Sequence, residues 1–212
     1  MARRAAAVVV VAISLGAAWY ALAPWPTHHA AERGARLLAA QDYLGASRVL
    51  LAAVAAAPGD ARVHFYLGLA YARLGALAGA LNQLEEAVHL APDDAQFHDG
   101  LGQVYRDAGQ VSRAWAAFDE AIRRGPDEPR YRVHLAGLLL DTGRVPDAVG
   151  ALRRAVELAP RRAELRLLLA AALRQAGERD EAARQYREAR RLAADGVIAE
   201  LARQELRIAT LR

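Results

Sequence analysis

Apolar residues recur at helical spacing along most of the chain, and their pattern repeats every 34 residues. Two helix-breaking residue types keep this period: Pro58, Pro92, Pro126 and Pro160, and Gly75, Gly109, Gly143 and Gly177. In each repeat the glycine falls between two helical stretches and the proline follows the second stretch. These are the places where a chain-reversing glycine and a helix-stopping proline belong. The pattern predicts five units of two helices each: 27–60, 61–94, 95–128, 129–162 and 163–196.

Equivalent positions of successive units also agree in side-chain size. Small residues stand at 68, 102, 136 and 170 and again at 80, 114, 148 and 182, and large ones stand at 71, 105 and 139 and at 84, 118 and 152. The small residues let paired helices approach closely, and the large ones fill the space beside them. Because one unit cannot bury its own apolar face, the units must stack. The sequence therefore predicts an all-α fold, a right-handed α-solenoid.

This pattern resembles the tetratricopeptide repeat (TPR), in which a large-small pair, Tyr, Ala, Phe, Ala and Pro recur over 34 residues. The third unit carries it as Leu101-Gly102, Tyr105, Ala114, Phe118, Ala121 and Pro126. The first unit is looser, and the fifth has Ala194 where proline is expected. The resemblance covers about residues 27–196 and implies about five helix-turn-helix repeats. The chain departs from the family pattern at His64 and His98, where the family often has Trp.

The residues after the fifth unit continue the helical pattern. Val197, Leu201, Ile208 and Leu211 fall at helical spacing. We expect residues 197–212 to form a C-terminal capping helix that covers the last repeat.

The N-terminal residues 1–26 differ in character from the repeats. Arg3 and Arg4 precede 19 uncharged residues, Ala5 through Ala23. At about 1.5 Å per helical residue these 19 residues span roughly the 30 Å of a bilayer core. We therefore expect one transmembrane helix as a signal anchor, followed by a short linker. The two arginines favour a cytoplasmic N-terminus and an extracytoplasmic repeat domain, which places the protein in a bacterial inner membrane with its repeats in the periplasm.

A cleaved signal peptide is the alternative. Ala21-Leu22-Ala23 is a small-x-small triplet typical of a cleavage site, but Pro24 follows it directly, and the apolar run is longer than that of most cleaved signals. Aromatic residues (Trp19, Tyr20 and Trp25) gather at one end of the run, as interfacial aromatics do. Either reading would carry residues 27–212 across the membrane.

Charge and composition exclude several classes of function. The formal net charge is +4, and Arg3 and Arg4 supply two of those charges, so 26 Arg face 24 acidic residues from residue 27 onward. These charges are interleaved, and no basic cluster indicates nucleic-acid binding. The chain has no Cys, which excludes disulfides, thiolate catalysis and zinc-thiolate sites. All basic residues are Arg, which we interpret as the coding bias of a GC-rich genome.

We find no residues arranged for catalysis, and we expect no enzyme activity, metal or cofactor. The sequence has no GxSxG, HExxH or phosphate-binding glycine motif. His64 and His98 hold the same repeat position, so packing explains them better than metal ligation. The acidic pairs Asp93-Asp94 and Asp127-Glu128 recur at repeat junctions, where helix capping is a simpler interpretation than a metal loop.

The resemblance implies that the first helix of each repeat lines a concave groove for an extended or helical partner segment. At the corresponding positions this chain has Arg62, Phe65, Leu69, Arg73, Gln96, Asp99, Gln103, Arg106, Arg130, Val133, Leu140 and Arg174, together with Gly137, Glu164, Leu167 and Ala171. The apolar members could instead be buried by a neighbouring helix. An apolar floor edged by Arg and Asp favours a ligand of mixed character.

These observations lead to the hypothesis of a membrane-anchored TPR scaffold or adaptor. It would bind a segment of a partner protein and support the assembly or stability of a membrane or periplasmic complex. Two alternatives remain open at this stage: a permanent structural subunit of a larger membrane complex, and a cleaved, soluble periplasmic adaptor.

Overall fold

The computed structural model describes residues 25–193 and 196–210, and in these ranges the chain forms eleven α-helices and no strand. The helices are α2 (Trp25–Ala39), α3 (Tyr43–Ala56), α4 (Ala61–Arg73), α5 (Leu77–Leu90), α6 (Ala95–Asp107), α7 (Val111–Arg124), α8 (Pro129–Asp141), α9 (Val145–Leu158), α10 (Ala163–Gln175), α11 (Arg179–Ala193) and α12 (Val197–Thr210). The prediction of an all-α helical-repeat fold is confirmed.

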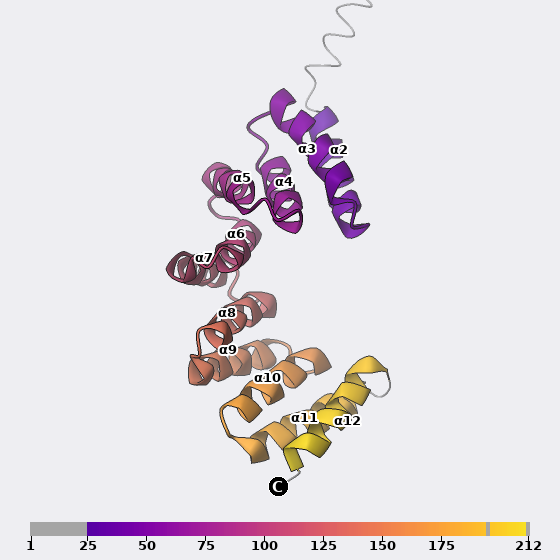
Figure 1. Ribbon diagram of the computed structural model, residues 1–212, viewed down its shortest axis with the longest axis vertical. Coiled ribbons are helices and arrows are strands. Elements are labelled where there is room, and N and C mark those ends of the chain that lie inside the picture. Colours follow the sequence, from indigo (N-terminus) through magenta and orange to yellow (C-terminus); the bar gives the residue numbers. More distant parts are fainter. Residues whose placement is uncertain (1–24, 194–195, 211–212) are drawn as a thin grey trace, which may run out of the picture. The chain divides into compact units, whose positions relative to one another are not determined.

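The chain divides into two compact units, one ending at Pro92 and the other beginning at Asp93. In the first unit α2 packs on α3 and α4, and α4 packs on α3 and α5 (Figure 1). In the second unit each helix from α6 to α11 packs on the one that follows it. Each unit thus buries its apolar faces between successive helices, as stacking of repeats requires.

Four periodic glycines reverse the chain between paired helices. Gly75, Gly109, Gly143 and Gly177 have φ of 79°, 70°, 74° and 83°. This left-handed conformation strains any residue with a Cβ, and it lets the chain close the first helix of a pair and begin the second. At Gly109, for example, Gln110 donates its backbone N–H to the carbonyl of Tyr105 at 2.8 Å. The turn role predicted for these glycines is confirmed.

Close approach of the paired helices depends on the small residue at the eighth position of each unit. A Cβ added to Gly102 would lie 2.7 Å from two ring carbons of Phe118, and one added to Gly68 would lie 2.6 Å from Leu84. Both distances are shorter than van der Waals contact. The large side chain on the second helix therefore rests directly on the backbone of the first.

Acidic side chains cap the N-terminus of the first helix in three consecutive repeats. Asp60 accepts from the N–H of Arg62 at 3.0 Å, Asp94 from Gln96 at 2.8 Å, and Glu128 from Arg130 at 3.4 Å. These bonds satisfy backbone donors that a helix start leaves free. The capping interpretation of the acidic repeat junctions is confirmed at Asp94 and Glu128.

The equivalent position before α10 is Arg162, which makes no side-chain capping bond. We expect Arg162→Asp to raise the free energy of unfolding by about 0.5–1 kcal/mol, because the new carboxylate would accept a backbone N–H and face the positive end of the helix. Urea denaturation would measure the change. Arg161→Asp makes the same charge change one residue earlier and should have a smaller effect. Equal gains in both variants would contradict a capping origin.

A second periodic contact joins the first helix of a repeat to the proline before it and to the second helix of the same repeat. His64 is buried, and its ring nitrogens lie 2.8 Å from the carbonyl of Pro58 and 2.8 Å from Oε1 of Gln83. At the equivalent positions of the fifth repeat, Arg166 donates to the carbonyl of Pro160 at 3.0 Å and to Oε1 of Gln185 at 3.0 Å. His64 therefore has a packing role, as predicted.

The C-terminal helix α12 packs on α11 and α10. Val197 and Leu201 are 76% and 43% exposed, whereas Ala199 and Ala202 are buried. Alanines therefore supply buried positions of α12, and the larger Val197 and Leu201 do not. Small alanines allow α12 to approach α11 closely, and that contact sets the rotation of the helix. The side chains of Ile208 and Leu211 lie outside the described residues.

Within residues 25–193 and 196–210, no helix has the length and apolar character needed to cross a bilayer. The predicted anchor at residues 5–23 lies outside the part of the chain that the structure describes.

Candidate functional site

The predicted groove positions of the first unit lie on α4. Arg62 and Arg73 are exposed near the two ends of this helix, and Leu69 between them is half-buried. Phe65 is buried, and its ring packs edge-on against Tyr66 with centroids 5.4 Å apart. Phe65 thus has a core role in the structure, the alternative that the sequence left open for the apolar positions.

In the second unit a buried polar network joins α6 to α8. Asp99 is only 4% exposed. Its Oδ1 lies 2.7 Å from Nδ1 of His134, and its Oδ2 accepts from Gln103 at 3.1 Å. An ionised carboxylate can only accept, so Nδ1 of His134 is the donor. The network fixes the register of two groove-lining helices.

The sequence did not identify His134 as a site residue. It follows the predicted groove position Val133 by one residue, so the repeat alignment alone does not select it. No signal in the sequence identified it, because the burial of Asp99, which makes a donor from a neighbouring helix necessary, is known only from the structure.

Arg106 continues the polar contacts between α6 and α8. Its Nε lies 3.8 Å from Oδ2 of Asp141 and 3.9 Å from Oδ1 of Asp107. A Cβ added to Gly137 would lie 2.9 Å from Nη1 of Arg106, so the missing side chain leaves the arginine room to reach across α8. Because these ion pairs are partly exposed and weak, a charged group of a ligand could replace Asp107 or Asp141 as the partner of Arg106.

Arg130 presents a positive charge at the start of α8. Its guanidinium donates to the Tyr131 hydroxyl at 3.1 Å and lies 5.0 Å from the Tyr131 ring centroid. Burial lowers the pKa of Arg130, but the hydrogen bond and charge of Tyr131 and the charges of Asp99 and Glu128 raise it more. The side chain is therefore a permanent cation beside the Asp99 network.

Gln96, on α6, is half-buried.

The apolar groove positions of α8 and α10 are Val133, Leu140 and Leu167. All three are half-buried and pack on the core formed by α8, α9 and α10. Each side chain thus uses one side for packing and leaves the other accessible. Together with Arg106 and Arg130, these positions form what we call the α6–α8–α10 face.

Helix α12 occupies the end of this face. Nε of Arg174 lies 3.4 Å from Oε2 of Glu205, and the Tyr186 hydroxyl donates to the same oxygen at 3.4 Å. A hollow of about 230 Å³ lies beside these three residues and is lined also by Leu167, Leu168, Ala171 and Leu201. Arg174 is therefore engaged by Glu205, which the sequence did not identify. Glu164 and Ala171 are exposed on α10.

Tyr186 makes this end of the second unit sensitive to high pH. Burial, together with the nearby charge of Glu205, raises the pKa of Tyr186 above its ordinary 10.0, although Arg174 acts in the opposite direction. Above pH 10 the unfolded chain loses this proton while the folded chain keeps it. The free energy of unfolding therefore falls as the pH rises. We expect Tyr186→Phe to reduce the loss of stability between about pH 9 and 11, measured by urea denaturation. Identical pH slopes for the variant and the wild type would contradict this.

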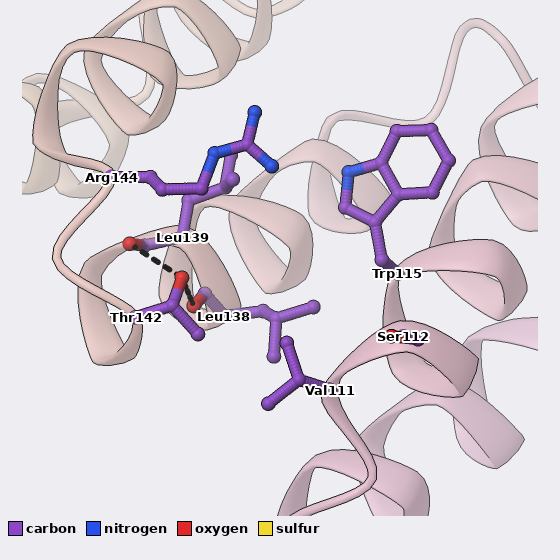
Figure 2. A pocket seen from close by; sticks show the side chains of 7 residues that line it. All are labelled: Val111, Ser112, Trp115, Leu138, Leu139, Thr142 and Arg144. Atoms are coloured by element: carbon purple, nitrogen blue, oxygen red, sulfur yellow. Dashed lines mark hydrogen bonds between the residues drawn. The ribbon is translucent and has the colours of Figure 1, made fainter.

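A second hollow, of about 270 Å³, opens between α7 and the end of α8. Figure 2 shows Trp115 and Arg144 on opposite sides of it, with Val111 and Leu138 between them. Trp115 is 43% exposed. Its repeat position holds Leu81, Val149 and Ala183 in the second, fourth and fifth units, so the periodic pattern identified an apolar position and not an exposed indole.

The polar groups of this hollow are largely occupied. Thr142 Oγ1 donates to the carbonyls of Leu138 and Leu139 at 2.9 and 3.1 Å (Figure 2). Arg144 pairs with Asp147 at 2.7 Å. In the described part of the chain, no group of three His, Asp or Glu residues could hold a metal ion.

A family model described as Tetratricopeptide repeat matches residues 32–95, 100–163 and 135–197. No curated protein matches the chain.

Solved structures share the fold at low identity. TTC0263, a thermophilic TPR protein of Thermus thermophilus, is 22% identical with a TM-score of 0.68, over 88% of this chain and 100% of that one. MamA from Desulfovibrio magneticus RS-1 is 18% identical with a TM-score of 0.68, over 80% and 96%. YrrB, described as a TPR protein with an unusual peptide-binding site, is 16% identical with a TM-score of 0.62, over 82% and 90%.

Proposed function

The chain belongs to the tetratricopeptide-repeat family, and we propose that it is a membrane-anchored scaffold that binds a segment of a partner protein. The protein acts by binding and performs no reaction of its own. It supports the assembly or stability of a membrane or periplasmic complex.

The observation that carries the binding role is the composition of the α6–α8–α10 face. Half-buried Val133, Leu140 and Leu167 offer apolar contact, and Arg106 and Arg130 offer charge in fixed positions. The Asp99–His134 bond holds α6 and α8 in register before any ligand arrives. Such preorganisation reduces the entropy lost on binding. The fold that YrrB shares, and the peptide-binding site named in its description, support this proposal.

The membrane role rests on the 19 uncharged residues from Ala5 to Ala23, preceded by Arg3 and Arg4. In this proposal the N-terminus is cytoplasmic, a single helix crosses the inner membrane, and the repeats are periplasmic. The anchor keeps the repeats attached to the membrane that a membrane-bound partner shares.

Site-specific photo-crosslinking in cells tests the binding face. A photoreactive residue at Gln103 or at Leu140 should give a discrete crosslinked product of higher mass. The same residue at Arg154, an exposed position on α9, is the matched control and should give none. Equal products at all three positions, or none at the two groove positions, would refute binding on this face.

The anchor is tested separately. Alkaline carbonate extraction should leave the protein in the membrane pellet, and N-terminal sequencing should begin at or near Met1. A mature chain beginning at Pro24 in the soluble fraction would establish the cleaved adaptor instead. Mild detergent extraction and sizing then distinguish a transient adaptor from a permanent subunit, which would stay in a large assembly.

A further inference from the structure

Helix α3 exposes an apolar face that no described helix covers. Leu44 and Leu51 are 59% and 53% exposed, and the alanines at 52, 55 and 56 are exposed on the same side. From Tyr43 to Gly59 the sole charged residue is Arg48. An exposed apolar face with this little charge marks an interaction surface.

The other repeats show that the fold does not require this composition. Residues 51, 52 and 55 correspond, at successive steps of 34, to charged or titratable side chains on the second helix of every other repeat. These are Glu85, Glu86 and His89 on α5; Asp119, Glu120 and Arg123 on α7; Arg153, Arg154 and Glu157 on α9; and Arg187, Glu188 and Arg191 on α11. The apolar outer face is therefore particular to α3.

The position of α3 indicates what covers this face. A three-residue turn joins α2 to α3, and the two helices pack together, so they run in opposite directions. The Leu50 side chain, in the middle of α3, lies against Gly34, in the second half of α2. Because the helices run in opposite directions, the last turn of α3 lies toward the start of α2. Helix α2 begins at Trp25, two residues after the uncharged segment 5–23 ends. The apolar end of α3 thus lies toward the start of α2, to which the uncharged segment is joined in the sequence.

We propose that the outer face of α3, from Leu51 to Ala56, lies against the bilayer surface. The inference rests on the membrane anchor of the proposed function and adds the orientation of the first unit. Leu51 and the alanines would enter the interfacial layer, and Arg48 would remain with the lipid head groups, where a basic side chain is favoured by anionic lipid. No acidic residue lies on α3 to oppose this contact.

Single-cysteine fluorescence measures the contact in the full chain, because the native sequence has no Cys. Leu51→Cys and Ala55→Cys report on the proposed face, and Glu85→Cys is the matched control at the Leu51 position of the next repeat. Val10→Cys reports on the anchor. Each labelled protein is placed in nanodiscs of phosphatidylcholine and phosphatidylglycerol, with or without a lipid that carries a quencher below its head group. Far-ultraviolet circular dichroism checks that each variant is folded.

We expect lipid quenching at positions 10, 51 and 55 and none at 85. Quenching at 10 without quenching at 51 and 55 would overturn the α3 contact and leave the anchor intact. Labels at 51 and 55 that are shielded from aqueous iodide but not quenched by lipid would show that a protein covers the face, which also overturns the proposal. Absence of quenching at 10 would refute the anchor and, with it, the premise of this inference.

Discussion

Replacing Phe118 by alanine should lower the free energy of unfolding by about 3–5 kcal/mol. The ring is fully buried and rests on the backbone of Gly102, whose added Cβ would be 2.7 Å away. Since Gly102 has no side chain, nothing at that position of α6 can move in to fill the cavity. The loss should appear in urea denaturation as a lower midpoint with a similar dependence on urea concentration.

Two variants separate this effect from a general sensitivity of α7. Phe118→Leu introduces the residue found at the same position in three other repeats, Leu50, Leu84 and Leu152, and should cost about 1 kcal/mol. Trp115→Ala removes a larger ring from the same helix, but this ring is partly exposed to solvent. The free energy of unfolding should therefore fall much less than in Phe118→Ala. Equal losses for Phe118→Ala and Trp115→Ala would contradict the packing argument.

Removing His134 alone should cost about 3 kcal/mol, because it leaves the Asp99 carboxylate buried without the donor to Oδ1. His134→Leu tests this by denaturation at neutral pH. The double variant Asp99→Leu, His134→Leu removes both polar partners and should recover much of the loss, since no buried charge then lacks a partner.

The double-mutant cycle gives the coupling between the two side chains directly. Arg106→Ala is the control, because the Arg106 ion pairs are partly exposed and should contribute little to stability. A double variant that is less stable than His134→Leu by the full cost of Asp99→Leu would show no coupling, and the buried bond would then not be what fixes α6 against α8.

The sequence was a good guide to the fold because the fold is a repetition. Each unit must contain a turn glycine, a helix stop and small residues at the same spacing. An ambiguous pattern in one repeat can therefore be interpreted by comparison with the other repeats. The positive φ at Gly109 and the close approach at Gly102 both follow from the periodic pattern. The sequence did not predict which face of α12 is buried, because no later repeat exists to fix its register. The buried positions include Ala199 and Ala202, whereas the larger Val197 and Leu201 are exposed.

The candidate site was less predictable because exposure is not periodic. Phe65 and Leu69 belong to the same predicted set, yet one is buried and the other half-buried. Asp99 was expected at an open groove position and is instead buried between Gln103 and His134. A linear pattern cannot show which neighbouring helix supplies a donor, and so His134 and Glu205 could be identified only in three dimensions.

The sequence by itself determined the helical repeats, their turns and caps, the charge balance and the uncharged segment at 5–23, because each depends on residues close together in the chain. Only the tertiary structure decided which polar side chains pair between helices, how α12 is rotated, and that Trp115 and Leu51 are left exposed. Those outcomes depend on contacts between residues distant along the chain, and local spacing carries no information about them.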